Sequence, residues 1–481
     1  MGRITSCKTT IIIFLLGLVF TFHVSALPDT VSLTIHLRGV YESKITLLAL
    51  TDNKLFKTFR EVPVVKNGET SRITVPKDHL PGEFVLRFDY KGKESDTPYP
   101  SEKNIFINDQ DLELWVSPLY CNNADSTKFQ DGERENAAFL QFSKENGKQK
   151  EKLGLLQNFL MNYDDNDSKF YKLGIKEYEE RRETYNQWLK SRRQQDQSLF
   201  ISNLYCFQHI PGIVWEGTET DRIKNLINHY FDGMDFNSPL LIKTSELNKW
   251  MDNYVNLYGQ LSTTAALRDS LFPLAGRTAI EKARKGHPLV YGWMVDYFYR
   301  GYESNSIPAG MKILEPYMND PNCLTSKRLE IARRLKGIET LVAGSVAPDI
   351  VMNEKDGRLF EFSKLETQSN YILVLFWSAG CSHCVEMIDK LFPWQQQPEI
   401  LKAITVLAIS LDETEPEIKA WEQKLAELKG WNHLRAAEGI RSKVAADYFV
   451  LATPVMVLID AKTRKIVAVP NTLNELVTAV K

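Results

Sequence analysis

The sequence predicts a multidomain protein that joins an N-terminal all-β sandwich, an all-α middle region and a C-terminal α/β region. The chain has 481 residues, more than one ordinary hydrophobic core holds. Its pattern changes from strand-like alternation to helical periodicity near residue 130, and to alternating strands and helices after residue 345. The net charge is −2, with acidic and basic residues interspersed, which argues against a nucleic-acid partner.

Residues 1–26 have the pattern of a secretory signal peptide. Arg3 and Lys8 supply a positive start, residues 11–24 are mainly apolar, and small residues precede Leu27, the expected first mature residue. An uncleaved membrane anchor is the alternative, which the short apolar run disfavours. We therefore expect an exported protein.

Residues 27–125 predict a small antiparallel β-sandwich domain. The stretch Val31–Leu37 alternates apolar and polar residues, as a half-buried strand does. Turn signals such as Asn67-Gly68 separate the runs that follow. Further strands are expected at residues 44–50, 55–65, 70–75, 83–90, 104–107 and 111–116.

Residues 130–341 predict a helical domain. The clearest helix spans Lys169–Arg193, with Ser168 as its N-cap and one apolar face. That face consists of Ile175, Tyr178, Tyr185 and Leu189. Further helices are expected at residues 135–146, 150–163, 220–231, 245–258, 263–285, 288–302, 308–318 and 325–341.

An aromatic cluster in this helical domain allows two interpretations. It consists of Tyr291, Trp293, Tyr297, Phe298 and Tyr299. These side chains could line a groove for unfolded polypeptide, or they could form the core between helices. Spacings of three and four residues favour the core.

Residues 345–481 predict an α/β domain with a central sheet flanked by helices. Expected strands lie at residues 371–377, 404–411, 454–459 and 466–469, and expected helices at 381–392, 415–428, 442–447 and 473–480. The first strand is a buried apolar run that ends at Trp377. Cys381 and Cys384 follow after a short break.

The Cys381/Cys384 spacing favours reversible thiol–disulfide chemistry. At a helix start, cysteines three residues apart share one face and are close enough for a disulfide. Helix N-terminal N–H groups favour the thiolate of Cys381. The only cofactor that the sequence predicts is this redox-active Cys381–Cys384 disulfide, with no metal.

The stretch F-W-S-A-G-C-S-H-C, which ends at Cys384, resembles the active site of thioredoxin-like proteins, particularly the exported bacterial TlpA/ResA-like oxidoreductases. Ala347-Pro348-Asp349, Leu407–Glu413 and Thr453-Pro454 resemble further motifs of that family. The resemblance covers about residues 345–481 and implies a thioredoxin-like fold there. Together with the signal peptide, it implies the periplasm or cell envelope.

The resemblance also implies residue roles. Cys381 would be the attacking thiolate and Cys384 the resolving thiol. Glu413 would be a partly buried carboxylate that exchanges protons with Cys384. The alternative is a solvated glutamate in an acidic loop. Trp377, Thr453 and a cis Pro454 would bind substrate, the last two through exposed backbone groups.

Three positions modify this expectation. His383, between the cysteines, can stabilise the Cys381 thiolate and make the pair more oxidising, or can be an inert surface residue. Leu375 replaces the buried aspartate of thioredoxins proper, which gives Glu413 more importance. Pro393 lies about one turn later than the kinking proline of the family.

The expected function is an exported reductase of protein disulfides that a membrane electron-transfer partner recharges. A thiol oxidase or isomerase of the same fold is the alternative within this class. A peptide- or glycan-binding envelope protein with a vestigial redox domain is another. A metal carrier that uses Cys381, His383 and Cys384 is disfavoured, because no second cysteine pair completes a zinc site.

The remaining cysteines are expected to be free. Cys7 lies in the signal peptide, which leaves Cys121, Cys206 and Cys323 outside the redox pair. Buried free cysteine is the simplest interpretation. A Cys121–Cys206 or Cys206–Cys323 bridge is the alternative, which sequence alone does not decide.

Overall fold

The computed structural model describes residues 30–51, 55–121, 123, 126–305, 307–354 and 357–480. The expected signal peptide and Cys7 lie outside these ranges. Within them, no helix combines the length and the hydropathy needed to cross a bilayer. The chain divides into two compact units, the first mainly residues up to 137 and the second mainly residues from 138 onward.

The N-terminal region consists of two four-stranded sheets around one hydrophobic core, which confirms the all-β prediction. Their orders are β4-β1-β7-β8 and β3-β2-β5-β6. The strands are β1 Thr30–Leu37, β2 Glu42–Thr51, β3 Leu55–Lys66, β4 Thr70–Pro76, β5 Gly82–Lys91, β6 Tyr99–Ile107, β7 Leu112–Val116 and β8 Thr127–Phe129. One pairing departs from the antiparallel expectation, because β1 and β7 run parallel. The domain boundaries remain predictions, although β8 extends the sheet beyond residue 125.

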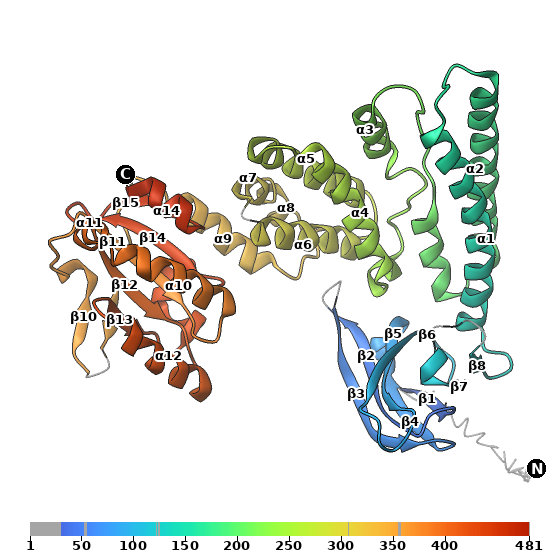
Figure 1. Ribbon diagram of the computed structural model, residues 1–481, viewed down its shortest axis with the longest axis horizontal. Helices are drawn as coiled ribbons and strands as arrows, with labels where there is room; N and C mark the ends of the chain where they lie inside the picture. The colour runs from blue at the N-terminus through green and yellow to red at the C-terminus, as the bar shows by residue number, and fades with distance from the viewer. Residues whose placement is uncertain are drawn as a thin grey trace, which may run out of the picture. The chain divides into compact units, whose positions relative to one another are not determined.

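The middle region is helical, as predicted (Figure 1). Its helices are α1 Glu135–Asn162, α2 Lys169–Gln195, α3 Glu219–His229, α4 Glu246–Leu261, α5 Ala265–Ala283, α6 Pro288–Ser304, α7 Pro308–Lys312, α8 Glu315–Met318 and α9 Arg328–Thr340. Ser168 caps α2 by accepting a hydrogen bond from the Tyr171 N–H. Two expected helices merge into α1, whereas residues 308–318 split because Pro316 fits only a first helical turn.

The aromatic cluster of this region belongs to its core. Tyr291, Trp293, Phe298 and Tyr299 are each at most 5% exposed. Tyr297 packs against the same cluster and donates its hydroxyl hydrogen bond to Asp252. The packing interpretation is therefore confirmed, and an open groove formed by these side chains is excluded.

The C-terminal region contains a five-stranded sheet in the order β13-β12-β11-β14-β15 (Figure 1). The strands are β11 Tyr371–Trp377, β12 Ile404–Ser410, β13 Asn432–Arg435, β14 Val455–Asp460 and β15 Ile466–Ala468, with a separate pair β9 Val351–Asn353 and β10 Leu359–Glu361. The helices are α10 Ser382–Gln395, α11 Pro398–Ala403, α12 Glu415–Glu427, α13 Lys443–Asp447 and α14 Leu473–Val480. α10 continues through Pro393.

The central strand β11 explains why the sequence before the cysteines is continuously apolar. It pairs parallel with β12 and antiparallel with β14, and both of its faces are covered. Ile372, Val374 and Phe376 belong to one hydrophobic cluster. The opposite face belongs to a second cluster, to which α10, α12 and α14 contribute. A strand buried on both faces has no polar alternation.

Candidate redox site

The two cysteines lie where β11 turns into α10. Cys381 is the N-cap of α10, and its carbonyl accepts hydrogen bonds from the backbone N–H groups of Cys384 and Val385, both at 3.1 Å. Cys384 is fully buried, whereas Cys381 is partly exposed. Both thiols are free in this structure and lie near each other. Only Cys381 is therefore accessible to a protein substrate.

The surroundings shift the two thiol pKa values in opposite directions. Burial alone would raise the pKa of Cys381, but hydrogen bonds from the Cys384 thiol, the Cys384 N–H and the Thr453 side chain outweigh it and lower that pKa. Burial, together with the hydrogen bond to Cys381, raises the pKa of Cys384 to about 12. Cys381 therefore ionises first, as a nucleophile must.

The loop that ends in Pro454 lies against the exposed sulfur. The Thr453–Pro454 peptide bond is cis. The Cys381 Sγ–H donates to the Thr453 carbonyl oxygen at 3.6 Å. Thr453 and Pro454 are half-buried, so part of each remains open to a ligand. The loop between α13 and β14 thus brings backbone polar groups to the reactive atom.

The turn before Cys381 is held by Asp412, a residue that the sequence analysis did not single out. Asp412 is fully buried. Its carboxylate accepts hydrogen bonds from the Ser378 hydroxyl at 2.6 Å and the Ala379 N–H at 2.9 Å. The Ser410 hydroxyl donates a third at 2.7 Å. Asp412 follows β12, the parallel neighbour of β11, and the carboxyl ends of parallel strands meet at one sheet edge.

Glu413 differs from the expectation. Its carboxylate binds the Arg441 guanidinium at 2.5 Å and lies against Gly439, and its side chain is one-third exposed. The Glu413 carboxylate therefore contacts Arg441. The buried carboxylate at the sheet edge that carries the cysteines is that of Asp412. The family motif identified the correct loop, and burial distinguishes the two neighbouring acids.

Trp377 also differs from its expected role as a substrate contact. It is fully buried in the same cluster as Leu375 and the α10 residue Ile388. Because alternate residues of β11 face opposite sides, Trp377 shares the face that α10 covers. A direct contact of this side chain with substrate is incompatible with that burial. His383 is exposed, as a residue that tunes the pair from the surface would be.

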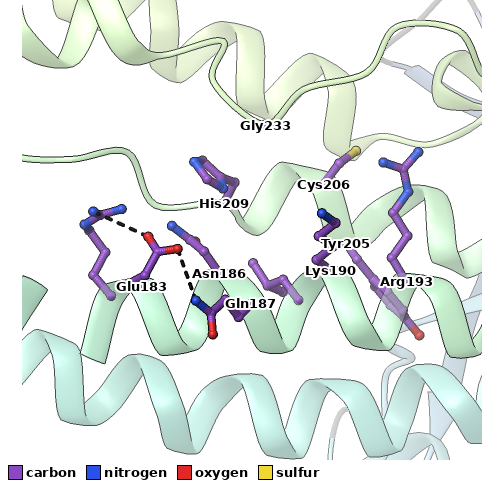
Figure 2. Close-up of a pocket in the computed structure, with 11 residues that line it drawn as sticks. Glu183, Asn186, Gln187, Lys190, Arg193, Tyr205, Cys206, His209 and Gly233 are labelled. Atoms are coloured by element: carbon purple, nitrogen blue, oxygen red, sulfur yellow. Dashed lines mark hydrogen bonds and ion pairs between the residues drawn. The ribbon is translucent and has the colours of Figure 1, made fainter. Parts of the chain in front are cut away.

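A cavity away from the two cysteines lies in the helical region, between α2 and residues 205–233 (Figure 2). Its volume is about 600 Å³. One wall carries the Arg182 guanidinium, which is already bound to Glu179 at 2.7 Å. Cys206 lines the cavity as well, but burial raises its pKa to about 12. This cavity can hold a ligand but offers no activated thiol.

Comparisons with known proteins agree with this geometry. A family described as thioredoxin-like matches residues 369–466. A thioredoxin-like protein from Bacteroides caccae is 18% identical over 56% of this chain and 97% of its own, with a TM-score of 0.39. The thioredoxin domain of a thiol-disulfide oxidoreductase from Bacteroides vulgatus is 28% identical over 29% of this chain and 96% of its own, with a TM-score of 0.25. A thiol:disulfide interchange protein from a Bacteroides species is 29% identical over 29% and 89%, with a TM-score of 0.24.

A search of curated proteins found no match. The family match begins at residue 369, inside the C-terminal region, so it leaves the β and helical regions unassigned. Inside the matched range lie both cysteines, the turn that Asp412 holds and the cis-proline loop. Residues 369–466 of this chain are a thioredoxin-like domain.

Proposed function

We propose that this chain is an exported thiol–disulfide oxidoreductase that reduces protein disulfides in the bacterial cell envelope. The observation that carries the proposal is the opposite environment of two adjacent cysteines. Cys381 is partly exposed and has a lowered pKa, whereas Cys384 is buried and has a raised pKa. A nucleophile and a protected resolving thiol need this asymmetry.

The reaction balances as a two-electron exchange. The Cys381 thiolate attacks one sulfur of a substrate disulfide, a mixed disulfide forms, and the other substrate sulfur leaves as a thiolate that takes up a proton. Cys384 then loses its proton and attacks the Cys381 sulfur. The Cys381–Cys384 disulfide forms, the second substrate thiolate leaves, and two electrons have passed to the substrate.

A reductase of this kind must be recharged. A dithiol donor returns two electrons and two protons to the Cys381–Cys384 disulfide and becomes a disulfide itself. Outside the cytosol that donor has to draw electrons across the membrane, which is why we propose a membrane electron-transfer partner. Export rests on the signal-peptide pattern of residues 1–26.

Two alternatives keep specific support. His383 favours an oxidase or isomerase, and the reduction potential separates these roles. A reductase should have a reduction potential of about −270 mV, and an oxidase one of about −120 mV.

The cavity of Figure 2 favours a ligand-binding role for the helical region, with a vestigial redox domain. In that case cellular function would survive Cys381→Ser but not deletion of residues 28–340.

The test is to trap substrates in cells. A Cys384→Ala variant cannot resolve the mixed disulfide, so adducts on Cys381 should accumulate and should dissolve on addition of a reductant. The matched control carries both Cys381→Ala and Cys384→Ala, and should trap nothing. Equal recovery of adducts from the two variants, or none from either, would refute a catalytic role for Cys381.

A further inference from the structure

A groove of about 690 Å³ extends from the redox site to the helical region. One wall includes His383, Thr453 and Pro454. Thr453 also accepts a hydrogen bond from the Cys381 thiol at 3.6 Å, so the groove passes close to the reactive atom. The opposite wall belongs to α9 and the end of α6, and includes Glu303, Ser304, Arg334, Gly337, Ile338 and Leu341.

α9 and the residues that follow it pack against the thioredoxin-like domain. Gly337 lies so close to Phe449 that a Cβ at position 337 would be 2.7 Å from the Phe449 Cβ. Leu341, just after α9, packs against the core of the domain. The chain then pairs with β15, where the Gly344 N–H donates to the Ile466 carbonyl at 2.7 Å. The wall is therefore built into the fold.

The lining of the groove combines polar groups with a set of apolar side chains, and its charges are balanced. Arg334 and Glu303 form an ion pair at 3.0 Å, so their charges offset each other. The partly exposed apolar side chains are Ile338, Leu341, Phe449, Leu451, Val455 and Val469. These six side chains give a ligand apolar surface to remove from water, which favours binding of apolar residues.

We propose that α9 and the end of α6 form the outer wall of the substrate groove and select an extended polypeptide segment with apolar residues beside its disulfide. The inference rests on the proposed function. Because Thr453 both lines the groove and contacts the Cys381 thiol, a disulfide at this end of the groove lies beside the attacking sulfur. The volume is that of a typical ligand site, and a small disulfide that engages only Cys381 has no need of the α9 wall.

The first test places a cation in the groove. Ile338→Lys should raise the KM for a peptide disulfide with apolar flanks about tenfold, since one apolar contact is lost. The rate with hydroxyethyl disulfide should not change. Leu329→Lys is the matched control, because Leu329 is on the same helix but 85% exposed, and it should leave both substrates unaffected. The lysine stem tolerates partial burial, which favours folding of the variant.

Equal KM values for apolar-flanked and serine-flanked peptides in the wild type would overturn the inference. So would an Ile338→Lys variant with unchanged peptide KM. If the wild type fails to reduce hydroxyethyl disulfide, the proposed function itself is wrong and the inference falls with it. The small substrate thus separates the two failures.

The second test moves the wall without adding charge. Gly337→Ala introduces the Cβ that meets Phe449, whereas Gly301→Ala on α6 introduces one with no heavy atom within 4 Å. The first should change the KM for the apolar-flanked peptide at least threefold and leave the small-disulfide rate intact, which also shows that the domain is folded. Equal behaviour of the two variants would contradict a wall formed by α9.

Discussion

The helical region and the thioredoxin-like domain contain the same side chain in opposite surroundings. In the helical region Cys206 and Cys323 are buried, and burial raises their pKa values to about 12 and about 11. In the thioredoxin-like domain the pKa of Cys381 is lowered, although burial opposes it there as well. The difference comes from the hydrogen bonds that Cys381 makes with the Cys384 thiol, the Cys384 N–H and Thr453, which together outweigh burial. Backbone hydrogen bonds also act on Cys206 and Cys323, but burial dominates there.

The comparison also settles the cysteine alternatives. Cys121, Cys206 and Cys323 are all free and buried, which confirms the simplest interpretation, and neither of the two structural bridges forms in this structure. The Cys206 thiol donates to the Asn203 carbonyl at 3.1 Å, and the Cys121 thiol to the Glu102 carbonyl at 3.3 Å. These cysteines behave as small apolar core residues.

The largest expected effect separates the two kinds of cysteine by activity. Cys381→Ser should reduce turnover of a peptide disulfide at least about 1,000-fold, because a serine hydroxyl is not ionised at neutral pH. Cys206→Ser should change turnover less than twofold. Steady-state kinetics on the full chain measure both. Similar losses in the two variants would mean that the two environments do not differ in function.

The second effect is a difference in reactivity within one reduced protein. Iodoacetamide should modify Cys381 at least about 100-fold faster than Cys206 at pH 7, because a raised pKa leaves little thiolate. The Cys381 rate should rise with pH with a midpoint below the ordinary thiol pKa of about 8.5, because the pKa of Cys381 is lowered. In Cys384→Ala, where the largest lowering contact is lost, the midpoint should move upward. Mass spectrometry of each peptide records the rates, and a midpoint above 9 in the wild type would contradict the environment described.

The fold class and the place of the two cysteines at a helix start could be predicted from the sequence, because both depend on local signals. The Ser378–Gly380 break after an apolar run was enough to place Cys381 at a helix start. Asp412 was missed because its role depends on the turn before Cys381, far away in sequence. Trp377 was misassigned because a strand buried on both faces gives no pattern that tells one face from the other.

The buried segment Phe200–Gln208 was missed for a related reason. It forms a 3₁₀-helix in which every residue except Gln208 is buried, so neither helical nor strand periodicity is present in its sequence.

The third effect tests whether the turn before Cys381 contributes to the lowered pKa of its thiol. Asp412→Asn should lower the free energy of unfolding by about 2 kcal/mol, because an amide nitrogen replaces an acceptor that buried donors use. The alkylation midpoint of Cys381 should shift as the turn loosens. Denaturant titration and the alkylation profile measure the two changes. An unchanged free energy of unfolding and an unchanged alkylation midpoint would show that Asp412 does not stabilise the turn that positions Cys381.

The smallest expected effect concerns Glu413, the exposed acid next to the buried Asp412. Glu413→Gln should change the rate at which Cys384 resolves a mixed disulfide less than twofold, since the Glu413 carboxylate is bound to Arg441 and lies against Gly439. Its stability cost should stay below about 1 kcal/mol, the usual range for an exposed ion pair. Stopped-flow measurement of thiol release from a preformed Cys381 adduct gives the rate. A tenfold loss would restore Glu413 as the proton carrier that the family resemblance implies, and would mean that the Arg441 contact opens during turnover.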